Sequence, residues 1–313
     1  MSSDPLHTET AAPLSAIGLI VVATVIFSAF DASAKYVAIA GVAPLFMAWV
    51  RYAVHVVAVV LFFRAWSDPA IFKPNSYVMQ LLRAFCLFGA TVFTFFAVQT
   101  LQLAEMISIF FAAPVFITAL AGPLLGEWAG WRRWLAVAVG FIGVLIVVRP
   151  SIGTISVGHL YAITCTFCYS FYAILTRRLS ATESPQSLIF FSGVAPVVLL
   201  LPVVPYHAEM PEDPVVIAVL LMLGILGAFG HLLLIQANRL ARATVLAPFS
   251  YLQLVWAIVL GWLVFSELPD RWVLIGSAVI VASGIYIAQR ERQLRLSTQS
   301  APNLEGSELA KKL

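Results

Sequence analysis

Apolar runs of about 20 residues recur along the whole chain, which is the length a helix needs to cross the hydrocarbon layer of a bilayer. Short polar segments separate the runs. Of the 313 residues, 61% are hydrophobic and only 11% are charged, which is less than half the charged share of an ordinary soluble domain. The pattern therefore predicts an all-α, polytopic membrane protein.

Ten such runs can be counted, and the segments between them are too short for a soluble domain. Residues 1–13 contain no Lys or Arg, so they lack the basic region of a cleaved signal peptide, and we expect the first run to remain as a span. The predicted spans are 14–38, 43–64, 77–99, 104–125, 131–149, 156–177, 186–205, 215–236, 243–265 and 271–289.

The distribution of Lys and Arg predicts the orientation, because cytoplasmic loops carry an excess of both residues. With a cytoplasmic N-terminus, only Lys35, Arg149 and Arg271 fall on the outer side. Thirteen fall on the inner side: Arg64, Lys73, Arg132, Arg133, Arg177, Arg178, Arg239, Arg242, Arg290, Arg292, Arg295, Lys311 and Lys312. We therefore expect cytoplasmic tails at 1–13 and 290–313, and an inner-membrane location.

An internal repeat appears when the chain is shifted by 140 residues. Glu127 in "LLGEW" then meets Glu267 in "VFSEL", and both glutamates follow a span of the same rank. The first repeat would cover residues 14–150 and the second 151–289. Because each repeat has an odd number of spans, the second must cross the membrane in the opposite sense. The sequence thus predicts a 5+5 inverted repeat, which is typical of secondary transporters.

The chain resembles the drug/metabolite transporter superfamily with two EamA-type repeats. The resemblance covers nearly all of 16–289 and is carried by "WVRYAV", "LLRAFCLFGA", "FFAAPVFITALAGPLLGEW", "RRWLAVAVGFIGVLIVVRP" and "ATVLAPFSYLQLVWAIVLGWLVFSELPDRW". The segments "DASAK" and "APFSYLQL" are similar to the branch that contains S-adenosylmethionine uptake carriers, with riboflavin carriers and amino-acid exporters as neighbours. The resemblance implies a ten-helix carrier for one of these substrates.

Charged residues inside the spans are the first candidates for a functional site, because their burial in lipid is costly. Asp31 and Arg51 both lie roughly 10–12 Å below the predicted outer surface, so they could pair. One interpretation is a structural ion-pair cluster that also includes Lys35, one turn beyond Asp31. The other is that Asp31, Arg51 and Glu105 line the outer half of a substrate path. Phe171 and Phe191 occupy the repeat-related positions of Asp31 and Arg51, so the scaffold itself does not require the charges.

Histidines and neutral polar residues supply further candidates. His231, His55 and Glu105 are candidate proton-coupling groups, since His titrates near physiological pH. An alternative for His231 is a structural hydrogen bond. The substrate-binding candidates besides Asp31 and Arg51 are Tyr169, Tyr172, Tyr251, Gln253 and Trp256. Each of these could equally serve in packing.

The function predicted from these features is secondary transport of a small organic metabolite by alternating access. No "GxxxxGK[ST]" motif is present, so a nucleotide-driven pump is disfavoured, and no cofactor, metal or nucleic-acid partner is expected. The five histidines form no catalytic cluster, which disfavours an integral membrane enzyme. A channel-like facilitator remains the main alternative, with protons as a candidate coupling ion and a monomer or homodimer as the assembly.

Overall fold

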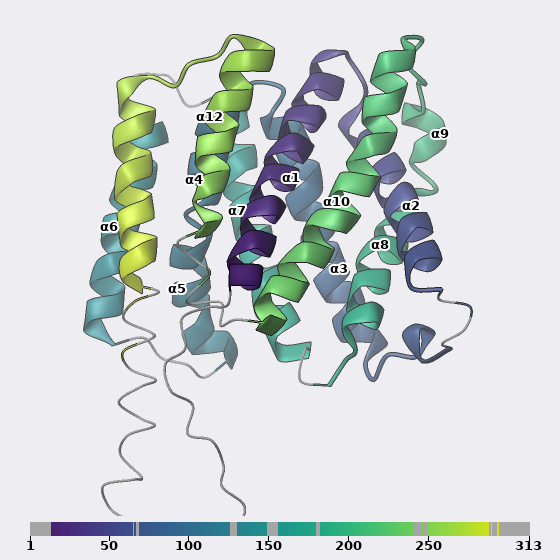
Figure 1. Cartoon of the computed structure of the whole chain (residues 1–313), viewed down its shortest axis with the longest axis horizontal. Coiled ribbons are helices and arrows are strands. Elements are labelled where there is room, and N and C mark those ends of the chain that lie inside the picture. Colours follow the sequence, from purple (N-terminus) through teal and green to yellow (C-terminus); the bar gives the residue numbers. More distant parts are fainter. Residues whose placement is uncertain are drawn as a thin grey trace, which may run out of the picture.

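The computed structural model describes residues 14–64, 66, 69–125, 130–148, 156–179, 182–240, 246, 249–287, 289 and 293. Within these residues the chain consists of helices and their connections, so the all-α prediction is confirmed. The helices stand side by side in one bundle (Figure 1). The start of α1 and the end of the last helix lie at the same, lower end of that bundle (Figure 1).

The described residues form ten spans when α4 and α5 are counted together. Two short helices, η2 (Pro69–Phe72) and α9 (Val204–His207), lie in the connections. The spans are α1 (Leu14–Ile39), α2 (Pro44–Phe62), α3 (Tyr77–Ala97), α4 (Leu103–Phe110) with α5 (Ala113–Leu125), α6 (Trp131–Val148), α7 (Val157–Leu179), α8 (Pro185–Leu200), α10 (Pro214–Leu240), α12 (Leu252–Phe265) and a last helix (Arg271–Ile287).

Five of these helical segments are long and apolar enough to cross a membrane by length and composition alone. They are Leu14–Ile39, Pro44–Phe62, Tyr77–Ala97, Leu103–Leu124 and Pro214–Leu234. Shorter apolar helices accompany them, and many large apolar side chains face outward from the bundle. An outward apolar surface of this kind suits lipid rather than water as the surrounding medium.

One predicted span is interrupted. The sequence predicts a continuous helix at 104–125, whereas the structure ends α4 at Phe110 and begins α5 at Ala113. Pro114 explains the break, because its ring clashes with the carbonyl four residues earlier and it has no N–H to donate. The span therefore consists of two helical pieces.

The end of α12 has a geometry that matters for the site. Ser266 adopts the left-handed conformation (φ 56°), and the backbone N–H of Glu267 donates to the carbonyl of Gly261 at 2.9 Å. A left-handed residue directly after the last helical residue, followed by a bond back to the last turn, ends a helix and turns the chain sharply. The turn brings Glu267 back towards α1.

The packing follows the inverted repeat. The most extensive contacts between helices are those of α1 with α10 and of α3 with α7. In each pair the first helix of one half packs against the third helix of the other half, so the two contacts are repeat-related. The contact of α1 with α12 likewise corresponds to that of α7 with α5. The centre of the molecule is thus built from both halves.

Candidate functional site

A hydrogen bond between the two halves lies at the centre of the polar residues. The side-chain amide of Gln253, in α12, donates through Nε2 to Oδ2 of Asp31, in α1, at 3.0 Å. One turn away, the hydroxyl of Ser28 donates to the backbone carbonyl of Gln253 at 3.1 Å. Asp31 is only 7% exposed. The carboxylate is therefore held inside the bundle by a neutral donor from the second half.

Arg51 approaches the same region from α2. Its guanidinium lies over the rings of Phe30 and Tyr52, with its central carbon 5.1 and 4.3 Å from their centroids. Arg51 is close enough to Asp31 to interact with it electrostatically. Among the described residues, however, no ion pair joins the two side chains. The predicted Asp31–Arg51 pair is therefore wrong as a direct contact, because the carboxylate is bound by Gln253 instead.

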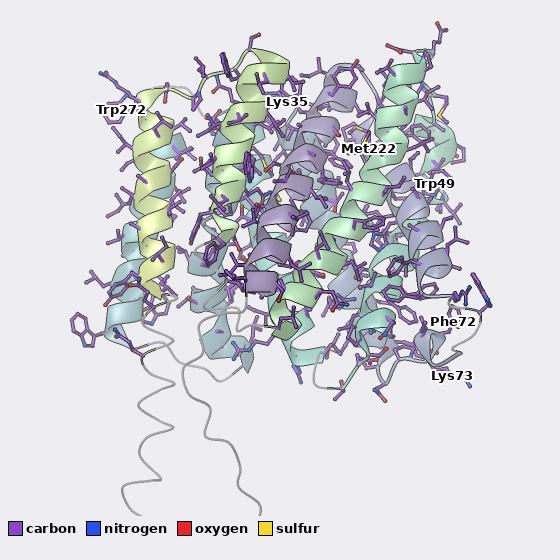
Figure 2. The ribbon with its side chains drawn as sticks, viewed as in Figure 1. Lys35, Trp49, Phe72, Lys73, Met222 and Trp272 are labelled. Atoms are coloured by element: carbon purple, nitrogen blue, oxygen red, sulfur yellow. The ribbon has the colours of Figure 1, made fainter. Side chains whose placement is uncertain are left out.

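Lys35 does not belong to the Asp31 cluster. Its ammonium lies 2.5 and 2.6 Å from the two carboxylate oxygens of Glu267 and donates to the carbonyl of Leu101 at 2.8 Å. Lys35 lies near the upper end of α1 (Figure 2). The interpretation of an ion-pair cluster of Lys35 with Asp31 and Arg51 is thus wrong. Glu267, directly after the end of α12, is the counter-ion of this buried lysine.

Glu105 forms a second link between the halves. Its Oε1 lies 2.8 Å from Nε2 of His159, at the start of α7, while the other ring nitrogen of His159 lies 2.8 Å from the hydroxyl of Ser156. Glu105 belongs to the first turn of α4. It therefore lies at a helix end against His159, and its neighbour in the structure is not Asp31 or Arg51.

Three glycines of α10 allow α1 and α2 to approach closely. A Cβ at Gly224 would lie 2.4 Å from Val54, and a Cβ at Gly230 would lie 2.7 Å from the ring of Phe27. At Gly227 the nearest atoms are those of the Arg51 guanidinium, at 3.5 to 3.8 Å. The absence of side chains at these glycines permits the close helix packing and explains how Arg51 reaches the centre of the bundle.

The two intramembrane histidines lie beside this glycine face. Nε2 of His55, in α2, is 3.4 Å from the carbonyl of Ile189, and its Nδ1 has no hydrogen-bond partner among the described residues. His231, in α10, packs edge-on against Phe27 with ring centroids 5.3 Å apart. Arg51 interacts electrostatically with both rings. The structure thus brings these two coupling candidates to the neighbourhood of Arg51.

The aromatic candidates divide into separate groups. Tyr169 packs against Phe110 and Tyr172, while Tyr172 lies beneath the guanidinium of Arg83 at 5.3 Å. Tyr251 packs against Phe111, and its hydroxyl lies against Gly284 of the last helix. Trp256 lies one turn beyond Gln253 in α12, and its indole nitrogen is buried without a partner among the described residues.

Arg83, in the first half of α3, is a further buried cation, with only 1% of the residue exposed. It donates to Ser192 at 2.9 Å, to the side chain of Gln80 at 3.2 Å, to Thr176 at 3.4 Å and to the carbonyl of Leu188. Arg83 therefore joins α3 to α7 and α8.

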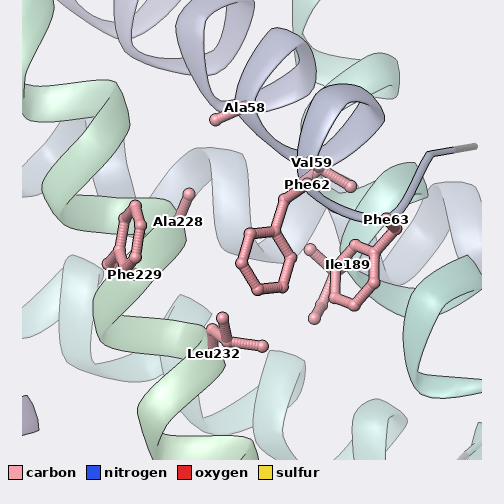
Figure 3. A pocket seen from close by; sticks show the side chains of 8 residues that line it. All are labelled: Ala58, Val59, Phe62, Phe63, Ile189, Ala228, Phe229 and Leu232. Carbon is pink, nitrogen blue, oxygen red and sulfur yellow. The ribbon is translucent and has the colours of Figure 1, made fainter.

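A separate apolar groove lies between α2, α8 and α10 (Figure 3). Phe62, Ile189, Phe229 and Leu232 are among its lining side chains, all of which are hydrocarbon. The groove has no group that could orient a polar molecule, so we do not assign the site there. Among the described residues, no three His, Cys, Asp or Glu side chains are grouped as metal ligands.

Comparisons with known proteins agree with this architecture. The chain is 29% identical over 222 residues to an S-adenosylmethionine uptake transporter of Rickettsia prowazekii, covering 71% of this chain and 74% of that protein. It is 25% identical over 288 residues to a riboflavin transporter of Vibrio cholerae, covering 89% and 94%. A solved crystal structure with 18% identity matches its fold with a TM-score of 0.62, covering 90% of this chain and 98% of the other. Residues 14–149 and 156–289 each match the EamA-like transporter family, so the chain is a multi-pass membrane protein that belongs to that family.

Proposed function

We propose that this protein is a secondary carrier that moves a small organic metabolite by alternating access through a central site between its two inverted repeats. The observation that carries the proposal is the buried hydrogen bond from Gln253 to Asp31, since its two partners come from different halves of the chain. A site shared by two halves changes its exposure when the halves rock against each other. Arg51, from a third helix, supplies a cation to the same region.

One end of the molecule offers a candidate gate. Lys35–Glu267 and Glu105–His159 each join the first half to the second. Lys35 is at the upper end of the bundle, opposite Lys73 (Figure 2). Under the proposal, with both termini cytoplasmic and the protein in the inner membrane, the upper end faces outward. The two links would then close the outer side of the substrate path.

The names of the relatives suggest which substrates to test first. These names suggest S-adenosylmethionine and riboflavin. Another vitamin and amino acids are the further candidate substrates, from the resemblance to the superfamily. Protons are the candidate coupling ion, with His231, His55 and Glu105 as the candidate titrating groups. The substrate-binding groups would be Asp31, Arg51 and Gln253, with Trp256 one turn away, and Tyr169, Tyr172 and Tyr251 in the aromatic walls.

Uptake into proteoliposomes tests the proposal directly. Purified protein should take up at least one radiolabelled candidate with a rate that saturates, and unlabelled substrate inside the vesicles should accelerate the entry of label. This counterflow is the property of a carrier, so uptake that never saturates and shows no counterflow would favour a channel-like facilitator. Recovery of a chemically altered compound would instead indicate an enzyme. Acceleration by an imposed pH gradient would identify protons as the coupling ion.

A further inference from the structure

Arg51 is a buried cation, and two of its three guanidinium nitrogens have no hydrogen-bond partner among the described residues. Only 4% of the residue is exposed. Its Nε and Nη1 atoms have no hydrogen-bond partner among the described residues. The groups around the guanidinium are the rings of Phe30 and Tyr52, the imidazoles of His55 and His231, and Gly227, which offers no side chain. None of them is a carboxylate within ion-pair distance. Leaving charged donors unpaired away from water is costly, so an acceptor from outside the chain would be bound favourably.

The other buried cations of the described spans show what a satisfied group looks like here. Lys35 has both oxygens of Glu267 and the carbonyl of Leu101. Arg83 donates to four acceptors on α3, α7 and α8, so that only its Nε is left without a partner. The fold therefore supplies acceptors where a cation has a structural role. Nε and Nη1 of Arg51 lack such acceptors, although Asp31 is close enough to interact electrostatically.

We infer that Arg51 is the binding site for a carboxylate group of the transported molecule, and that the Asp31–Gln253 pair receives a cationic group of the same molecule. The inference rests on the proposed carrier function. A planar guanidinium matches a carboxylate in shape and charge. One arginine balances a single negative charge, which fits a carboxylate better than a phosphate monoester, whose charge is about −2. Asp31 provides the opposite charge nearby, so the site suits a zwitterion of the amino-acid type and excludes a neutral ring compound such as riboflavin.

Paired substrates test the assignment in the wild-type protein. Proteoliposomes would be given S-adenosylmethionine and its decarboxylated form, phenylalanine and phenethylamine, and riboflavin, and the KM of each would be measured. We expect an acid to be transported with a KM on the order of 100-fold lower than that of its decarboxylated partner, since the latter leaves the guanidinium unpaired. Riboflavin should show no saturable uptake.

The variant Arg51→Lys separates carboxylate recognition from charge alone. It retains the positive charge but not the planar group, so the ratio of KM values between the decarboxylated compound and the acid should fall to below about 10. Glu209→Gln, in an exposed connection, is the matched control and should keep the wild-type ratio. The ratio does not depend on the amount of folded protein. If Arg51→Lys does not fold, the wild-type comparison decides alone.

Two failures can be told apart. Saturable uptake with counterflow of riboflavin, or of acid and decarboxylated compound with equal KM, would overturn the carboxylate assignment and leave the carrier function intact. An unchanged ratio in a folded Arg51→Lys variant would also overturn it. Absence of saturable uptake for every compound would overturn the carrier function and the assignment with it.

Discussion

At the scale of single residues, the buried carboxylate of Asp31 is the group on which the proposed site depends. Asp31→Asn keeps the size of the side chain and an oxygen that can accept the hydrogen bond from Gln253. We therefore expect folding to be preserved, with a melting temperature close to that of the wild type, while the loss of charge lowers the transport rate by at least about 100-fold. Melting curves and initial rates of uptake measure the two effects.

The control for this prediction is Glu209→Gln, which neutralises a carboxylate in the exposed connection before α10. It should change neither the melting temperature nor the rate. Wild-type uptake kinetics in Asp31→Asn would remove Asp31 from the transport mechanism.

Gln253 is expected to act through Asp31. Gln253→Ala removes the donor at 3.0 Å and leaves the carboxylate without its neutral partner, so it should alter the preference among candidate substrates and raise KM about 10-fold. Gln253→Glu places a second carboxylate beside Asp31 and should be more damaging. Competition by a panel of unlabelled compounds measures the preference. An identical profile in Gln253→Ala would show that the residue is outside the site.

At the scale of helices, the glycines of α10 determine how closely α2 can pack. Gly224→Ala introduces a methyl group 2.4 Å from Val54 and 2.7 Å from the backbone carbonyl of Arg51, so the helices must separate. Overpacking of this kind costs about 1–3 kcal/mol. The melting temperature in detergent should fall by several degrees.

Gly18→Ala is the matched control, because Gly18 also lies within a helix but has no heavy atom within 4 Å of an added Cβ. Alanine is the better helix former by about 1 kcal/mol, so this variant should be as stable as the wild type or more stable. Equal melting temperatures for the two variants would contradict the packing argument.

The spans could be predicted from the sequence because their length and apolar composition are local properties of the chain. The break at Phe111 and Ala112 was not predicted, although Pro114 was the signal that could have revealed it. Partners of the charged groups could not be derived in the same way. The position of Asp31 and Arg51 along their helices gives their depth, but the direction of each side chain depends on how α1, α2 and α12 are rotated and packed.

The same limit explains the missed Lys35–Glu267 pair, which joins residues 232 positions apart. One signal was present in the sequence. Lys35 lies near the outer end of the predicted span 14–38, and Glu267 lies just beyond the outer end of the span 243–265, with the opposite charge. By contrast, the glycine spacing of α10 is a sequence signal for close packing, because a missing side chain has this effect whatever the neighbouring helix is.

At the scale of the whole molecule, ten spans place both chain ends on one side of the membrane. The start of α1 and the end of the last helix lie at the same end of the bundle, in agreement with this expectation (Figure 1). A fluorescent protein that matures only in the cytoplasm should be bright when fused to either terminus, because the Lys and Arg excess places both ends inside. Opposite results for the two fusions would contradict the inverted repeat.

Alternating access also predicts that the links between the halves control which side of the site is open. In the structure, Ser28 is fully buried about 16 Å below the upper end of α1, so a cysteine there should react slowly with a membrane-impermeant maleimide added from outside. Glu267→Gln removes the charge that holds Lys35, and a loss of about 1.4 kcal/mol from the outward-closed state raises the open population tenfold. We expect Ser28→Cys, in a background without Cys86, Cys165 and Cys168, to be labelled about 10-fold faster when Glu267→Gln is added.

Glu209→Gln should leave the rate unchanged because it lies in an exposed connection away from the link. Equal labelling rates with and without Glu267→Gln would mean that the Lys35–Glu267 pair has a purely structural role and that another contact closes the outer side.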